Sequence, residues 1–142
     1  MPLFTQQTLK HSDYEICRRM LLDIFGQTEL RQFEEAWRAR SETASFATIV
    51  DDRVIGYILV DIHNKIEYLC VDPVFRNARL GSTLLTAALR QLRAEGAREI
   101  TLTTAKDSRL TGWYEKFGFA VVTNLYDAAG EFAGADMQLT TE

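Results

Sequence analysis

The sequence contains few cysteines, with only two among its 142 residues. Cys17 and Cys70 lie in apolar segments, and no other residues surround them at the spacing of metal ligands. We therefore expect no metal site. Reduced and buried thiols are typical of a cytoplasmic protein, so the sequence favours that location.

Long hydrophobic runs and a surplus of positive charge are also missing. No run approaches the roughly 20 apolar residues that cross a bilayer, and the N-terminus lacks the pattern of a signal peptide. The formal net charge of −4 argues against a nucleic-acid partner. Basic residues do outnumber acidic ones between Lys65 and Lys116, which suits a polyanionic ligand there and a cationic one elsewhere.

The composition is that of an ordinary globular protein, with 46% hydrophobic and 25% charged residues. At this length we expect one domain over residues 1–142, large enough for a core of its own. Apolar residues predict strands over 4–9, 44–50, 54–62, 66–71, 98–103, 119–125 and 132–139. They predict helices over 12–25, 28–40, 80–92 and 110–117. The strand–helix–strand unit in the middle predicts one parallel pair within a mostly antiparallel sheet, and so a mixed α/β fold.

Polar residues mark the expected helix starts. Ser12 followed by Glu15 has the spacing of a capping box, and Thr28 is expected to cap the second helix. Asp107 or Ser108 is expected to cap the short helix near the C-terminus.

The most informative segment is 66–82, where a buried strand leads through a short basic loop into a long helix. Free amides and the positive end of the helix dipole make such a helix start suitable for phosphate. Gly81 lets the backbone approach a ligand closely, and Arg76 and Arg79 add cationic donors. These features fit a phosphate site, and they also fit an ordinary turn with solvated arginines.

A second segment, 107–119, is a short helix that leads through Gly118 into a strand. It contains YEKFGF at 114–119, while the first segment contains VDPVFR at 71–76 and LGS at 80–82. Together, and in this order of elements, the two segments resemble the GNAT superfamily of N-acetyltransferases.

The resemblance implies a single-domain GNAT-like fold, with helices around a mixed sheet that splays between the strands ending at Val71 and near Thr103. Acetyl-CoA would bind in that wedge, with its pantetheine arm paired to main-chain groups of Leu69, Cys70 and Val71. The residues implied in holding its pyrophosphate are Arg76, Asn77, Ala78, Arg79, Leu80, Gly81 and Ser82.

Two positions depart from the family pattern. Arg79 replaces the first loop glycine, so its Cβ would crowd the phosphate, or its guanidinium would add a contact. Asp107 replaces a frequent asparagine, which keeps the capping role but places a carboxylate toward the CoA.

Amide formation from a thioester requires a neutral amine and an acid for the departing thiolate. The motif match assigns the acid to Tyr114, whose alternative role is that of one more aromatic in an apolar helix face. Glu67 is the candidate base because it shares the strand parity of Val71 beside the wedge, although a glutamate near a strand start is often solvated. The glutamate that some relatives carry on the next strand is Leu102 here, and we expect His63 to be exposed in a turn.

These features predict transfer of an acetyl group from acetyl-CoA to a primary amine of a small molecule or a peptide. The acceptor is expected against the N-terminal helices and the final hairpin, whose acidic residues would attract a cationic amine. A non-catalytic acyl-CoA-binding or regulatory domain is the alternative. We expect no nucleic-acid or membrane partner, and a homodimer is a further expectation because relatives are often dimers.

Overall fold

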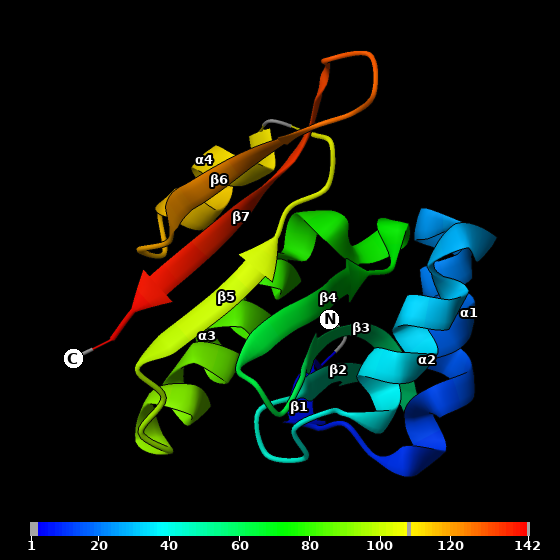
Figure 1. The fold of residues 1–142 in the computed structure, drawn as a ribbon. Coiled ribbons are helices and arrows are strands. Elements are labelled where there is room, and N and C mark those ends of the chain that lie inside the picture. Colours follow the sequence, from blue (N-terminus) through cyan, green and yellow to red (C-terminus); the bar gives the residue numbers. More distant parts are fainter. Residues whose placement is uncertain (1–2, 108, 142) are drawn as a thin grey trace.

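The computed structural model describes residues 3–107 and 109–141, and within them seven strands form one sheet (Figure 1). The strands are β1 (Thr5–Thr8), β2 (Phe46–Val50), β3 (Arg53–Val60), β4 (Lys65–Val71), β5 (Glu99–Thr103), β6 (Ala120–Tyr126) and β7 (Phe132–Thr140). Their spatial order is β1-β2-β3-β4-β5-β7-β6. The pair β4–β5 is parallel and the other neighbours are antiparallel, which confirms the predicted mixed sheet.

Helices cover both faces of this sheet. They are α1 (Tyr14–Phe25), α2 (Leu30–Arg38), α3 (Leu80–Ala94) and α4 (Arg109–Glu115), with short 3-10 turns η1 (His11–Asp13), η2 (Gln27–Glu29) and η3 (Pro73–Ala78). Figure 1 shows α1 and α2 together on one face, and α3 and α4 on the other. No helix of the described ranges is long and apolar enough to cross a membrane.

The two larger apolar clusters of the core lie one on each face of the sheet. On the α1–α2 face, Phe33 of α2 packs with Tyr57 of β3 and Tyr68 of β4. On the α3 face, Leu84 and Leu85 pack with buried residues of β3, β4, β5 and β7. Each fully buried side chain of this size stabilises the fold by about 1.5–3 kcal/mol, so the crossover helix α3 is firmly fixed.

The starts of α1 and α2 differ from the prediction. A 3-10 turn precedes each helix, so α1 begins at Tyr14 and α2 at Leu30. The expected capping box of Ser12 and Glu15 is wrong, because the Asp13 carboxylate accepts the amide of Lys10 at 2.9 Å instead. Thr28 lies inside the turn before α2 and does not cap that helix.

Candidate active site

The parallel strands β4 and β5 separate soon after they meet. Their register pairs Lys65 with Thr101 and Ile66 with Leu102, and no later described residue of β4 pairs with β5. The main-chain groups on this side of β4 are therefore open to an extended ligand. Figure 1 shows the two strands diverging toward η3 and the end of β5.

The open edge of β4 carries main-chain groups of two of the three expected residues. A Cβ built on Gly56 of β3 would lie 3.2 Å from the carbonyl oxygen of Cys70, so that carbonyl faces β3. Because main-chain groups alternate along a strand, those of Leu69 and Val71 face the gap. The carbonyl of Val71 accepts a hydrogen bond from Nε of Arg76 at 3.5 Å.

A β-bulge in β4 changes the direction of Glu67. The register pairs Leu59 with Tyr68 and Val60 with Ile66, which leaves Glu67 as the extra residue. Its expected parity with Val71 is therefore wrong. Val71 packs toward the α3 face, whereas Glu67 faces α2 on the other side of the sheet.

Glu67 lies in an open hollow of about 640 Å³ between α2 and β4. The hollow is lined by Thr28, Arg31, Gln32, Glu35, Lys65 and Glu67. The Glu67 side chain is only 10% exposed, and its Oε1 lies 3.6 Å from Nζ of Lys65. This glutamate is thus a largely shielded carboxylate rather than the solvated residue of the alternative interpretation.

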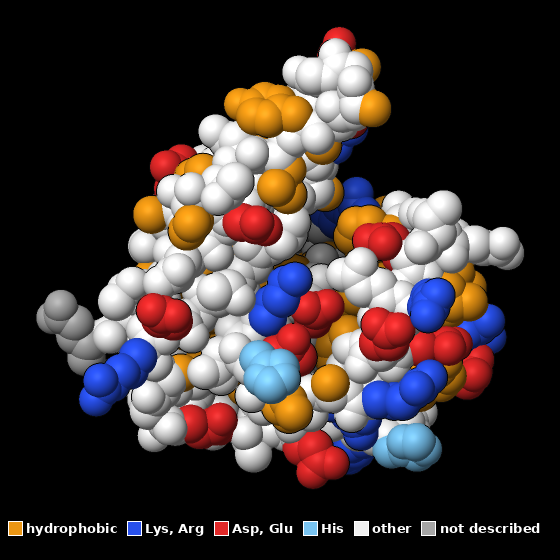
Figure 2. All heavy atoms as spheres, viewed as in Figure 1, with side chains coloured by type: hydrophobic (Ala, Val, Ile, Leu, Met, Phe, Trp, Pro, Cys, Tyr) orange, Lys and Arg blue, Asp and Glu red, His pale blue; other side chains and the backbone are white. Residues whose placement is uncertain are grey.

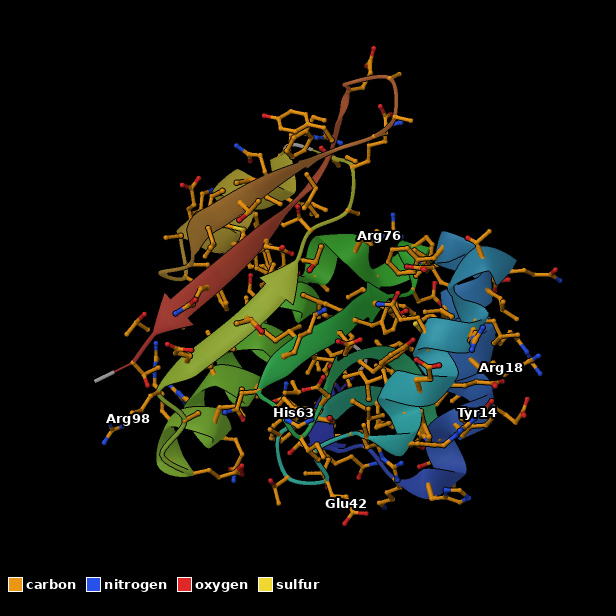
Figure 3. All side chains as sticks on the ribbon, viewed as in Figure 1. Tyr14, Arg18, Glu42, His63, Arg76 and Arg98 are labelled. Carbon is orange, nitrogen blue, oxygen red and sulfur yellow. The ribbon has the colours of Figure 1, made fainter. Side chains whose placement is uncertain are left out.

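The basic loop forms the expected junction between β4 and α3. Asp72 accepts the amide of Val74 at 3.0 Å, and the chain then winds through η3, which contains Arg76, Asn77 and Ala78. Figure 3 shows Arg76 beyond the end of β4, at the opposite end of the strand from His63. In α3 the amide of Thr83 bonds the carbonyl of Arg79, so the amides of residues 80–82 precede the first bond of the helix. These amides suit the pyrophosphate of acetyl-CoA.

Arg79 adopts the backbone conformation that the missing glycine would favour. Its φ is 60° and its ψ is 26°, which lies in the left-handed region, and its side chain is exposed. The loop therefore keeps a glycine-like backbone with an arginine in it, at a cost of roughly 1 kcal/mol.

Asp107 caps α4, and it is one of the two residues predicted for this role. Its Oδ1 accepts the amide of Arg109 at 3.0 Å, and its Oδ2 lies 2.8 Å from a terminal nitrogen of the Arg109 guanidinium. These hydrogen bonds hold the pKa of Asp107 below its usual value, so the carboxylate stays charged and paired. The other expected cap, Ser108, lies outside the described residues.

Tyr114 lies half-buried on α4, where it packs against the core of the α3 face. Its ring is in edge contact with Trp113, at 4.9 Å between centroids, and a Trp113 ring atom lies 3.8 Å from where a Cβ on Gly81 would be. The helix is thereby fixed beside the start of α3. Burial raises the pKa of Tyr114 to about 12, and the Cys70 thiol of β4 adds to the rise. Tyr114 thus keeps its proton near neutral pH.

The other candidates are not placed for catalysis. His63 is exposed, as expected, and Leu102 is 3% exposed in the core. Burial raises the pKa of the Cys70 thiol to about 12, so it stays protonated and unreactive. Within residues 3–107 and 109–141, no group of His, Cys, Asp and Glu side chains is arranged to hold a metal ion.

The model of the acetyltransferase (GNAT) family matches residues 12–119, which include the splayed strands, the loop and α4. The chain belongs to this family. It is thus an N-acetyltransferase that uses acetyl-CoA as its acetyl donor, and nothing in the comparisons favours the non-catalytic alternative.

This GNAT chain is similar to one curated acetyltransferase and to several solved structures. It is 27% identical to N-alpha-acetyltransferase 30 of Schizosaccharomyces pombe, over 87% of this chain and 85% of that protein. Arabidopsis thaliana Naa50 in complex with the bisubstrate analogue CoA-Ac-MVNAL has a TM-score of 0.80 at 16% identity, covering 97% and 99% of the two chains. The Escherichia coli ribosomal-protein-S18-alanine N-acetyltransferase has a TM-score of 0.78 at 19% identity, covering 97% and 94%.

Proposed function

We propose that this N-acetyltransferase acetylates the α-amine at the N-terminus of a peptide or protein. The observation that carries the proposal is the gap between β4 and β5, which leaves main-chain groups of β4 open to an extended ligand. The names of the relatives support a peptide acceptor, since they include an N-alpha-acetyltransferase and a structure with a peptide-derived analogue.

In this proposal Tyr114 stabilises the departing sulfur of CoA. The amine nitrogen attacks the thioester carbonyl, a C–N bond forms, and the C–S bond then breaks. Because the pKa of Tyr114 is raised to about 12, its hydroxyl remains a hydrogen-bond donor to the thiolate throughout the working pH range.

Glu67 takes the proton of the attacking amine, directly or through one water molecule. The Glu67 side chain is largely shielded and lies on the α1–α2 face of the sheet. Glu67 directly follows Ile66, the last residue of β4 that pairs with β5. Its Oε1 lies 3.6 Å from Nζ of Lys65, which orients the carboxylate on this face. We further propose a cytoplasmic location, supported by the two free and buried thiols.

Thiol release from acetyl-CoA tests this function. The substrates are tetrapeptides X-Ala-Ala-Ala, with each amino acid in turn at X, together with spermidine and the free amino acids. Release of CoA with peptides, and a mass increase on the peptide α-amine, would support it. CoA release with only the small amines would overturn the peptide assignment, and tight acetyl-CoA binding without any release would favour a non-catalytic domain.

A further inference from the structure

On the face of the sheet opposite α3, β5 and β7 carry polar side chains at the point where the wedge opens. Leu102 and Met137 are paired and buried toward α3, so the next pair, Thr103 and Asp136, faces the opposite side. Figure 1 shows no helix over that side of β5, β7 and β6. Asp136 is therefore open to a ligand that approaches from the α1–α2 face.

Asp136 and Glu67 lie on opposite sides of the wedge at one level of the sheet. Glu67 is the residue after the last β4–β5 pair, and Thr103 is the residue after that pair on β5. Two strand spacings separate β4 from β7, which amounts to roughly 10 Å where the strands are paired. Figure 2 shows this face hollowed between the part over β5–β7 and the part over η3 and the N-terminal helices, with acidic side chains on both sides.

The two carboxylates differ in their partners. Glu67 is paired with Lys65 at 3.6 Å. Asp136 accepts a hydrogen bond from the hydroxyl of Thr103 at 2.7 Å and makes no ion pair within the described ranges. Thr103 thus fixes the direction of Asp136 and leaves its negative charge uncompensated.

A buried hydroxyl without a partner lies on the same face of the sheet as Glu67. The bulge turns Tyr68 to the same face as Glu67, and its ring packs between Phe25 and Phe33, next to the turn that connects α1 and α2. Tyr68 is 5% exposed, and its hydroxyl has no hydrogen-bond partner among the described residues. An unpaired buried hydroxyl costs about 1–3 kcal/mol, which a bound polar group at this face would offset.

We infer that Asp136, oriented by Thr103, binds the protonated amine of the acceptor across the wedge from Glu67. This role rests on the proposed function, because it assigns the acceptor-binding residue of the same reaction. Asp136 attracts the ammonium as a charged hydrogen-bond acceptor, and Glu67 then receives its proton, so that the neutral amine attacks. A primary ammonium has three N–H donors and can engage both carboxylates in turn, whereas a trimethylated amine has none.

Steady-state kinetics of Asp136→Asn with the tetrapeptide panel test this role. We expect the KM for the peptide to rise about tenfold or more, while the KM for acetyl-CoA and the melting temperature stay at their wild-type values. Thr103→Val should raise the peptide KM less. The matched control is Glu42→Gln, which removes an exposed carboxylate from the turn between α2 and β2 and should change neither constant.

Calorimetric binding of Ala-Ala-Ala-Ala to the protein saturated with CoA provides a readout that does not need turnover. Weaker binding by Asp136→Asn than by the wild type supports the assignment. If peptides react but Asp136→Asn keeps the wild-type peptide KM and affinity, the assignment of Asp136 is wrong and the proposed function stands. If no peptide binds or reacts, both fall. Should Asp136→Asn fold poorly, Asp136→Glu and Thr103→Val replace it in the same comparison.

Discussion

Arg79 holds a left-handed backbone that glycine adopts without strain. Its φ of 60° keeps the phosphate loop in shape, and its guanidinium projects from the loop into solvent. The residue identity was visible in the sequence, but its backbone conformation was not. The structure therefore separates two effects of this position, backbone strain and side-chain charge, and each can be measured.

Replacing Arg79 by glycine and by alanine separates these effects. Both variants remove the charge, but only glycine relieves the strain, so Arg79→Gly should be more stable than Arg79→Ala by about 1 kcal/mol in urea unfolding. If the guanidinium contacts the pyrophosphate, both variants should bind acetyl-CoA more weakly than the wild type by a similar factor. Equal stability of the two variants would contradict the backbone argument.

The raised pKa of Tyr114 predicts the high-pH side of the rate profile. At saturating peptide, kcat should stay level on the alkaline side to at least pH 10.5. An ordinary tyrosine, with a pKa near 10, would begin to lose its proton there, whereas Tyr114 titrates at about 12. Stopped assays of kcat between pH 6 and 10.5 check this, and a decline centred near pH 10 would contradict it.

At the scale of the elements, periodicity predicted positions well and local geometry poorly. The fourth strand was predicted at 66–71 and is β4 at Lys65–Val71, because buried residues alternate along it. The starts of α1 and α2 were wrong, since a 3-10 turn satisfies the first amides without the predicted side-chain caps. The bulge at Glu67 could not be predicted, because it depends on the register with β3.

The junction of β5 and β7 depends on Gly134. Its φ is 142°, and a Cβ at this position would overlap the carbonyl oxygen of Thr104. Gly134→Ala should therefore lower the free energy of unfolding by more than about 2 kcal/mol, as measured in urea. Gly130→Ala is a useful comparison because no atom lies within 4 Å of its Cβ position, although its φ of 78° is also left-handed. An equal effect of the two substitutions would contradict the steric argument.

At the scale of the whole molecule, the strand order brings together residues that are distant in the sequence. Because β7 lies between β5 and β6, Asp136 is paired with Thr103 and lies at the level of Glu67. Local patterns predicted the final hairpin but not which of its strands would join β5. The family motifs predicted the loop and Tyr114, whereas the acceptor side depends on this long-range pairing.

Acetyl-CoA should stabilise the whole fold, because its expected contacts come from β4, the loop and α3. At a concentration about 100 times its dissociation constant, the gain is about 2.7 kcal/mol, which corresponds to a rise in melting temperature of roughly 5–10 °C. Differential scanning fluorimetry checks this. S-Acetyl-N-acetylcysteamine, a thioester without the nucleotide, should give no shift at the same concentration. Absence of a shift with acetyl-CoA at millimolar concentration would contradict the assignment of the wedge.

The turnover of Tyr114→Phe with acetyl-CoA and a reactive peptide is the decisive test of the role of Tyr114. We predict that kcat falls about 100-fold, while the dissociation constant of acetyl-CoA and the melting temperature are unchanged, because only the donor to the thiolate is lost. Tyr126→Phe, which alters an exposed tyrosine on β6, should keep the wild-type kcat. A Tyr114→Phe variant with the wild-type kcat would contradict the account.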